Sequence, residues 1–277
     1  RDTAAEVRAA AAASLRELVE TLPAEPDLRD GLAAALAEPD PVVRAAALDV
    51  LRALRLGDAA LFAASLTDSD IAVRIEAVRA LVSVDAAGEL AGAALSDPSR
   101  EVRVAIAKGL ATVSAERSTA VGPATVDAER QSAEAPATVG AEESASGATA
   151  AVDPTLAAIE AALTGLLDDP DALVRAAAYG ALGTTGCPAP LVSRAVAALS
   201  EAAWQVRAGA ATALSVAEPD VAVPALAKTL GDANADVRKA AVLALTRHRA
   251  TEEARAALAT ATTDSDADVR AYAGRAL

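Results

Sequence analysis

The residues best suited to chemistry in this sequence are an acidic residue and an arginine that recur together at a fixed spacing. An Asp or Glu stands six residues before an Arg, and this combination occurs eight times in 277 residues. The acids are Asp2, Glu38, Asp68, Asp97, Asp169, Glu201, Asp232 and Asp264, and the arginines are Arg8, Arg44, Arg74, Arg103, Arg175, Arg207, Arg238 and Arg270. A carboxylate beside a guanidinium could serve acid–base catalysis or form a structural ion pair. Eight identical sets favour the structural role over catalysis.

Two apolar positions accompany each acid and arginine. A Val directly precedes every one of these arginines, and a Leu follows seven residues later, ending with Leu277. At 100° per residue, the Val, the residue three after the Arg and the Leu share one helical face, which predicts a core. The Arg lies on the flank of that face, near the turn of a neighbouring repeat. We therefore expect an ion-pair ladder between successive repeats, which sets their register even where a single exposed pair contributes little.

The spacing of the arginines predicts the architecture. Successive arginines are 29 to 36 residues apart except for one interval of 72. A period of about 31 residues with helical patterning indicates a two-helix unit that must stack on its neighbours to bury its apolar face. In the third unit, helix A is expected over about 58–66, and helix B follows the N-cap Asp70 and runs to about Val82. The equivalent capping candidates are Asp40, Ser99, Asp171, Asn234 and Asp266.

The long interval divides the chain. Residues 1–111 hold the first four repeats, of which the first is incomplete, and residues 154–277 hold the last four, of which the last is truncated. Residues 112–153 are rich in Ala, Ser, Thr, Glu and Gly, with almost no large apolar residue. This composition predicts a disordered surface insertion, with a modifiable or partner-binding tether as the alternative. Both ends of the chain suggest a fragment of a longer product or a processed chain.

Composition narrows the functional classes. The formal net charge of −14 argues against nonspecific nucleic-acid binding, which needs clustered Lys and Arg. Cys187 is the sole cysteine, so an intrachain disulfide and a cysteine-based metal cage are excluded. We find neither an apolar run long enough to span a membrane nor a signal peptide. An acidic, cytoplasmic protein without a membrane partner is expected.

The pattern Asp-x-[Asp/Asn/Ser]-x-x-Val-Arg-x-x-Ala-x-x-Ala-Leu resembles HEAT repeats. More narrowly, it is similar to the short HEAT-like repeats first named from phycobilin lyase subunits. The resemblance covers nearly the whole chain outside the insertion. It implies an all-α, right-handed, armadillo-like solenoid of about eight two-helix repeats. It is much less specific for function, because members of this superfamily serve as protein-binding scaffolds, chromophore-lyase subunits, deoxyhypusine hydroxylase and a class of DNA glycosylase.

The catalytic branches of that superfamily can be compared with these residues. Deoxyhypusine hydroxylases carry paired His-Glu motifs for a di-iron centre, whereas the only histidine is His248, which has no adjacent Glu. His248 is instead expected near a helix C-terminus, where a basic residue suits the helix dipole. The glycosylases use a basic concave face with aromatic residues around a flipped base, which a single Trp and an acidic chain disfavour.

Other enzyme motifs are missing as well. The sequence has no Gly-rich phosphate loop and no Gly-x-Ser-x-Gly elbow. Cys187 is expected in a turn between repeats, as a structural residue rather than a reactive thiol. We therefore predict that the protein is not an enzyme and needs no cofactor and no metal.

The resemblance implies that helix B lines the concave surface. The helical positions opposite the core fall at −3, +1 and +5 relative to each Arg. Apart from Asp49, the large residues at these positions form the candidate partner-binding set: Ile71, Ile75, Arg79, Arg100, Val104, Lys108, Trp204, Lys239, Leu243 and Arg275. Basic residues outnumber acidic ones here, the reverse of the whole chain, and Trp204 is the best single anchor because Trp is enriched at binding hot spots.

We predict a non-catalytic scaffold or adaptor whose concave face binds an acidic and hydrophobic peptide or protein surface. The alternative for Trp204 is packing against a neighbouring repeat, with ordinary solvated charges around it. Two other interpretations stay open: an accessory subunit of a bilin-type chromophore lyase, which visible absorbance of the purified protein would favour, and the interaction arm of a larger enzyme. The identity of the partner and the oligomeric state do not follow from the sequence.

Overall fold

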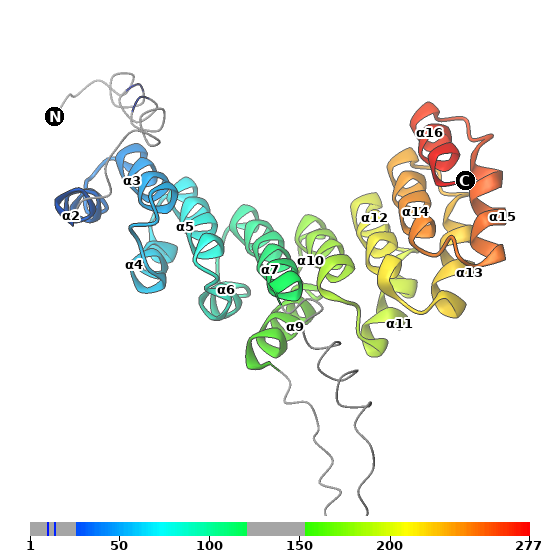
Figure 1. Cartoon of the computed structure of the whole chain (residues 1–277), viewed down its shortest axis with the longest axis horizontal. Helices are drawn as coiled ribbons and strands as arrows, with labels where there is room; N and C mark the ends of the chain where they lie inside the picture. The colour runs from blue at the N-terminus through cyan, green and yellow to red at the C-terminus, as the bar shows by residue number, and fades with distance from the viewer. Residues whose placement is uncertain (1–9, 11–13, 15–25, 121–152) are drawn as a thin grey trace, which may run out of the picture.

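The structure is a computed structural model that describes residues 26–120 and 153–277, together with the single positions 10 and 14. Within these residues every regular element is a helix, and consecutive helices pair into units (Figure 1). The A helices are α2 (Pro26–Ala35), α4 (Ala59–Ala64), α6 (Ala87–Ala93), α9 (Pro154–Leu166), α11 (Ala189–Ala198), α13 (Pro219–Thr229) and α15 (Glu252–Ala261). The B helices are α3 (Pro41–Ala53), α5 (Ile71–Ser83), α7 (Arg100–Ala120), α10 (Ala172–Thr185), α12 (Trp204–Ala213), α14 (Ala235–Arg247) and α16 (Ala267–Ala276). Short 3-10 helices, η2 (Ser65–Thr67) and η3 (Leu214–Val216), follow α4 and α12.

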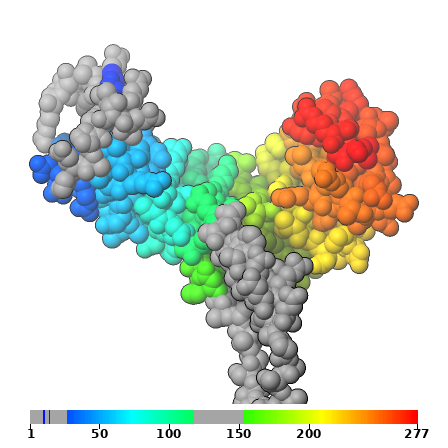
Figure 2. All heavy atoms as spheres, viewed as in Figure 1, coloured from blue at the N-terminus to red at the C-terminus, as the bar shows by residue number. Residues whose placement is uncertain are grey.

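The units stack side by side into an arc (Figure 1). The B helices form the inner layer and the A helices form the outer layer, so helix B lines the concave side. In the space-filling view, the hollow lies between the blue and cyan N-terminal units and the orange and red C-terminal units (Figure 2). The predicted α-solenoid is confirmed. The first predicted unit, with Asp2, Arg8 and Leu15, lies outside the described residues.

The core runs between the two layers along the whole array. The Leu seven residues after each Arg is completely buried in six units, at Leu51, Leu81, Leu110, Leu182, Leu214 and Leu245. Leu277, at the equivalent position after α16, is exposed, because no further described unit packs over it. The face predicted from the angular spacing is thus the face that each unit buries.

Short polar side chains start most of the B helices. Asp70 accepts hydrogen bonds from the backbone N–H groups of Ala72 and Val73, which would otherwise lack partners in the first turn of α5. The predicted caps of the other units act similarly: Asp40, Ser99, Asp171, Asn234 and Asp266. Helix α12 differs, because it follows Ala203 and has no side-chain cap.

The insertion begins later than the composition predicts. Residues 112–120 are helical, because α7 continues to Ala120. Val113 accounts for this extension: it lies ten residues after Arg103, on the same helical face as Leu110, and is completely buried. The buried Val113 thus extends the apolar face of α7 beyond Leu110, into the segment that the composition assigns to the insertion.

The array is continuous across the insertion. Helix α7 packs against α10, as successive B helices do elsewhere in the array, and α6 also packs against α9. Arg117, near the end of α7, forms ion pairs with Asp85 and with Asp153, where the described chain resumes. Residues 121–152 lie outside the described residues, so the disorder expected there stays a prediction.

Candidate functional site

The recurring acid and arginine form a ladder that joins the turns of successive units. Arg44 is representative: its Nε and Nη2 donate hydrogen bonds to the Asp68 carboxylate at 2.7 and 2.8 Å. Its Nη1 donates to the backbone carbonyl of Glu38, the acid of its own unit, at 2.8 Å. The other pairs of this ladder are Arg74–Asp97, Arg103–Asp169, Arg175–Glu201, Arg207–Asp232 and Arg238–Asp264. The predicted ladder is confirmed, and each Arg also holds its own turn.

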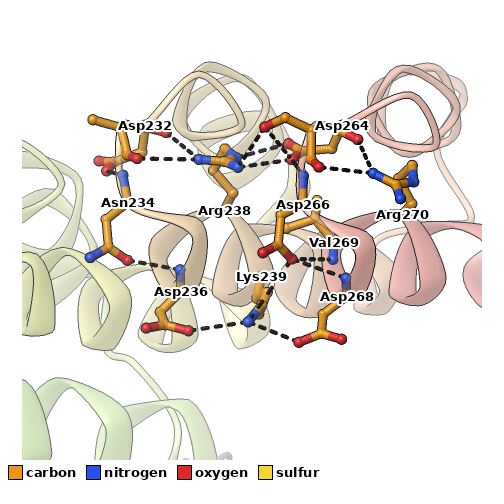
Figure 3. Close-up of polar contacts among 12 residues, drawn as sticks. Asp232, Asn234, Asp236, Arg238, Lys239, Asp264, Asp266, Asp268, Val269 and Arg270 are labelled. Atoms are coloured by element: carbon orange, nitrogen blue, oxygen red, sulfur yellow. Dashed lines mark hydrogen bonds and ion pairs between the residues drawn. The ribbon is translucent and has the colours of Figure 1, made fainter.

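The aspartates of the ladder accept hydrogen bonds from their own turn as well as from the arginine of the preceding unit. In Figure 3, Asp232 accepts a hydrogen bond from the backbone N–H of Asn234, and Arg238 reaches Asp264 in the next unit. The hydrogen bond from Arg44 lowers the pKa of Asp68, although burial acts in the opposite direction. Arg207 and Arg238 lower the pKa of their partner carboxylates in the same way. Asp68, Asp232 and Asp264 are therefore held as carboxylates by the arginines of the ladder.

Four of the predicted partner-binding residues lie together in a groove between α5 and α7. Ile75 and Arg79 contribute from α5, and Val104 and Lys108 contribute from α7. The groove has a volume of about 430 Å³ and is also lined by apolar residues such as Val82. These are the +1 and +5 positions of two neighbouring B helices, so the groove opens on the side of the B layer away from the core.

One glycine and the large side chains around it shape the groove between α5 and α7. Gly109 lines the groove, and a Cβ at this position would lie 2.8 Å from Cγ2 of Val82. The equivalent residue in the other described units is Val or Ala: Val50, Ala80, Ala181, Ala213, Ala244 and Ala276. In the middle of the array, the +1 and +5 positions hold only small or short residues: Ala176, Gly180, Ala208 and Thr212. Large side chains on α5 and α7 form the walls that α10 and α12 lack.

A row of alternating charges leads from α3 to this groove. Arg52 contacts Asp49 on α3, and its Nε lies 3.4 Å from Oε1 of Glu76 on α5. The other carboxylate oxygen of Glu76 accepts a hydrogen bond from Arg79 at 2.8 Å. Arg52 and Glu76 were missed by the sequence analysis, because they lie outside the −3, +1 and +5 positions. Their spacing of three residues from Asp49 and Arg79 is the pattern that could have identified them.

The cations around the groove differ in their partners. Lys108 is exposed, and no ion pair to it is found among the described residues. Arg100, at the start of α7, pairs with Glu101 and lies 3.5 Å from Asp171. A hydrogen bond from the Ser99 hydroxyl, followed by backbone N–H and Arg100 hydrogen bonds, lowers the pKa of Glu101 to about 2. Arg100 is therefore largely neutralised, whereas Lys108 is not.

The remaining predicted residues are separate from this groove. Ile71, at the first position of α5, is 45% exposed, Trp204, at the first position of α12, is 38% exposed, and Leu243 on α14 is 52% exposed. Arg275 lies over the Tyr272 ring at 6.0 Å, within the range of a cation–π contact. The candidate set thus divides into one groove and several isolated positions.

Lys239 is the candidate whose charge is most completely compensated. Its Nζ lies 3.3 Å from Asp236 and 3.1 Å from Asp268 (Figure 3). A third carboxylate, that of Asp266, lies at 4.0 Å. Lys239 joins α14 to the start of α16, so the sequence count of basic residues overstates the positive charge of this face.

The two groups most often found in active sites have structural environments here. His248 is buried at the C-cap of α14, and its Nε2 is 2.9 Å from the backbone oxygen of Leu214. Cys187 lies between α10 and α11, where burial raises the pKa of its thiol to about 11. Across 26–120 and 153–277, no group of three or more His, Cys, Asp or Glu is arranged to hold a metal ion. In the same part of the chain, no helix is both long and apolar enough to cross a membrane.

Comparison with known proteins agrees with the geometry. Residues 192–277 match the sequence profile of the family described as HEAT repeats. The chain is similar to the crystal structure of YibA from E. coli, with 17% identity and a TM-score of 0.56, over 100% of this chain and 87% of that one. It is also similar to a chain from a study of Kap95p and RanGDP, with 15% identity and a TM-score of 0.58, over 99% of this chain and 38% of that one. No curated protein matches the sequence.

At these identities, the structural likeness establishes the fold. The chain is an α-solenoid, and residues 192–277 of it are similar to HEAT repeats. The narrower resemblance to the repeats of phycobilin lyase subunits stays a prediction, as do the lyase-subunit and enzyme-arm interpretations.

Proposed function

We propose that this protein is a non-catalytic scaffold that binds a partner protein or peptide on the concave face of its B helices. Solenoids of this fold commonly serve as protein-interaction scaffolds, and Kap95p binds RanGDP. The observation that carries the proposal is the groove between α5 and α7, where Ile75 and Val104 provide apolar surface and Arg79 and Lys108, one helical turn further along the same two helices, provide positive charge.

Apolar surface in a concave site supports binding because its removal from water is favourable and its shape restricts what can enter. Ile71, exposed at the start of α5, adds apolar surface on the same helix. The cations at the rim favour a partner with acidic residues and disfavour one with basic residues. The recurring acids and arginines, which are the residues best suited to catalysis, pair with one another in the ladder.

A charge-reversal experiment tests this proposal. The variant carries Arg79→Glu, Arg100→Glu and Lys108→Glu, and a control carries the same change of charge on the outer layer and its turns, with Lys228→Glu, Arg249→Glu and Arg255→Glu. Proteins captured from the source cell by each variant are quantified by mass spectrometry. We expect partners of the unmodified protein to be retained by the control and reduced at least about tenfold by the groove variant, because close charge pairs at interfaces are worth several kcal/mol. Equal capture by both variants would contradict the proposal.

A further inference from the structure

The charge row beside the groove contains an incomplete pair. Glu76 is nine-tenths buried and lies between two guanidinium groups. Its Oε2 accepts a hydrogen bond from Arg79 at 2.8 Å. Its Oε1 and the Nε of Arg52 are both buried without a hydrogen-bond partner, although the two atoms are only 3.4 Å apart. Unsatisfied buried polar atoms are unfavourable, and these two are complementary to each other.

The two arginines that share Glu76 differ in exposure. The Arg79 side chain is 65% exposed and lines the groove, whereas that of Arg52 is half as exposed and does not line the groove. Arg52 also contacts Asp49, so it is held on both sides. Arg79 is therefore the member of the row that a ligand can reach, and Arg52 is the member that can stay with Glu76.

Resting on the proposed function, we propose that the groove binds a peptide segment in which a carboxylate neighbours an aliphatic side chain, and that Arg79 exchanges Glu76 for this carboxylate while Glu76 closes onto Arg52. The exchange leaves no buried charge alone. Before binding, Glu76 has one hydrogen bond to Arg79; after binding, it has one to Arg52, whose Nε gains the acceptor that it lacks. The buried carboxylate keeps a partner throughout, so the large penalty for an isolated buried charge is avoided.

The groove selects the other half of the ligand. Its apolar lining includes Ile75, Val78, Val82 and Val104, which suits an aliphatic side chain. Lys108, on the opposite wall from Arg79, provides a second cation for the carboxylate. A volume of about 430 Å³ accommodates a few side chains of an extended or helical segment rather than a folded domain. Charge and shape thus point to an acidic and aliphatic peptide segment of a partner protein.

The ligand class is tested with random dodecapeptides displayed on phage and selected on the whole chain, with counter-selection on the Arg79→Glu, Lys108→Glu variant. The expected result is enrichment of peptides with Asp or Glu close to Leu, Ile or Val. Affinities of a synthetic enriched peptide and of its Asp→Asn or Glu→Gln counterpart are then measured by fluorescence anisotropy. Arg79→Ala is expected to weaken the acidic peptide about tenfold or more, because hydrogen bonds to charged groups are the strong ones. Failure to enrich any such peptide would overturn the proposed ligand.

The exchange is tested through Arg52, which the proposal makes a positioning residue. Arg52→Ala should weaken the acidic peptide about tenfold, because releasing Arg79 would then leave Glu76 buried and unpaired. The same substitution should not change the affinity of the amide counterpart. Glu76→Gln should strengthen binding of the acidic peptide a few-fold, since Arg79 no longer has a competing carboxylate, and it should restore affinity when combined with Arg52→Ala.

The outcomes separate the exchange from the function on which it rests. If Arg52→Ala weakens acidic and amide peptides equally, or if Glu76→Gln does not restore binding, Arg52 only supports the structure and the exchange is wrong. The capture of cellular partners on the concave face can still succeed in that case. Circular dichroism of each variant checks its fold, and Glu76→Gln, which preserves the shape of the side chain, keeps the test decisive if Arg52→Ala does not fold.

Discussion

The joint between α5 and α7 and the joint between α10 and α12 connect equivalent helices by different means. At the first joint, Arg74 donates two hydrogen bonds to Asp97 at 2.8 and 3.1 Å, and both side chains are less than one-tenth exposed. At the second joint, the ladder pair is Arg175–Glu201, with a single contact at 3.3 Å and a Glu201 side chain that is 41% exposed. The ladder is therefore strong at the first joint and weak at the second.

Backbone contact replaces the ladder at the second joint. A Cβ on Gly183 in α10 would lie 2.6 Å from the backbone oxygen of Thr212, and a Cβ on Gly209 in α12 would lie 2.5 Å from that of Ala176. The two helices touch through their backbones at both glycines. Because α10 and α12 approach so closely, no groove forms between them. The larger side chains of α5 and α7 form the walls of the groove at the first joint. The array thus fixes register mainly by the ion pair at the joint with the groove and mainly by backbone contact at the joint between α10 and α12.

Acid is expected to change the stability of the protein most, because it acts on several ladder pairs together. The folded-state pKa values of Asp68, Asp232 and Asp264 are lowered by hydrogen bonds from their arginines. A lowered pKa contributes stability that is present above the unfolded value, about 4, and is lost as pH falls through the folded value. We expect the urea midpoint to fall steeply below about pH 4.

Hydrogen exchange at low pH, corrected for intrinsic rates, shows where that loss occurs. The interfaces α3/α5, α12/α14 and α14/α16 should lose protection first, because each contains one of these Asp–Arg pairs. The glycine contact between α10 and α12 contains no titratable group and should persist. Earlier loss at α10/α12 would show that the backbone contact does not compensate for the weak ladder pair.

Substitution of one acid at each joint gives the next largest effect. Asp97→Asn leaves Arg74 buried with a weakened partner and should lower the free energy of unfolding by about 3 kcal/mol. Glu201→Gln removes an exposed single contact and should lower it by less than about 1 kcal/mol. Urea denaturation of the two variants measures the difference. Equal losses would mean that the burial of the ladder pair does not determine its contribution.

The sequence predicts what every unit shares and little of what distinguishes one unit from another. The Val, Arg and Leu spacing predicts the solenoid and the ladder because each position is repeated and has one simple physical role. The neutralisation of Lys239 could not be predicted, because its partner Asp268 belongs to the next helical unit and depends on how far apart the helices lie. The same holds for the contact between Glu76 and Arg52, which forms only when α3 and α5 pack.

Glycines were the features that the sequence analysis passed over. Gly109, Gly183 and Gly209 stand at helical positions in an Ala-rich chain. Helix propensity alone indicates only that each is slightly less favourable than Ala. Their effect depends on what faces them. Gly109 faces a Val side chain, whereas Gly183 and Gly209 face backbone oxygens. A glycine that faces a side chain therefore lies at the groove, and the two glycines that face backbone oxygens lie where α10 and α12 approach closely.

A single methyl group at the second joint is expected to have a smaller effect than Asp97→Asn, and it is the most direct test of the comparison. Gly209→Ala would place a Cβ 2.5 Å from the backbone oxygen of Ala176, which cannot rotate away as a side chain could. We expect a loss of about 2 kcal/mol in the free energy of unfolding, typical of overpacking, with increased exchange in α10 and α12. Gly180→Ala in α10 is the matched control, because nothing lies within 4 Å of its Cβ and the substitution should stabilise the helix by up to about 1 kcal/mol. If both variants are equally stable, α10 and α12 can separate without cost, and the weak Arg175–Glu201 pair marks a flexible joint rather than one held by backbone contact.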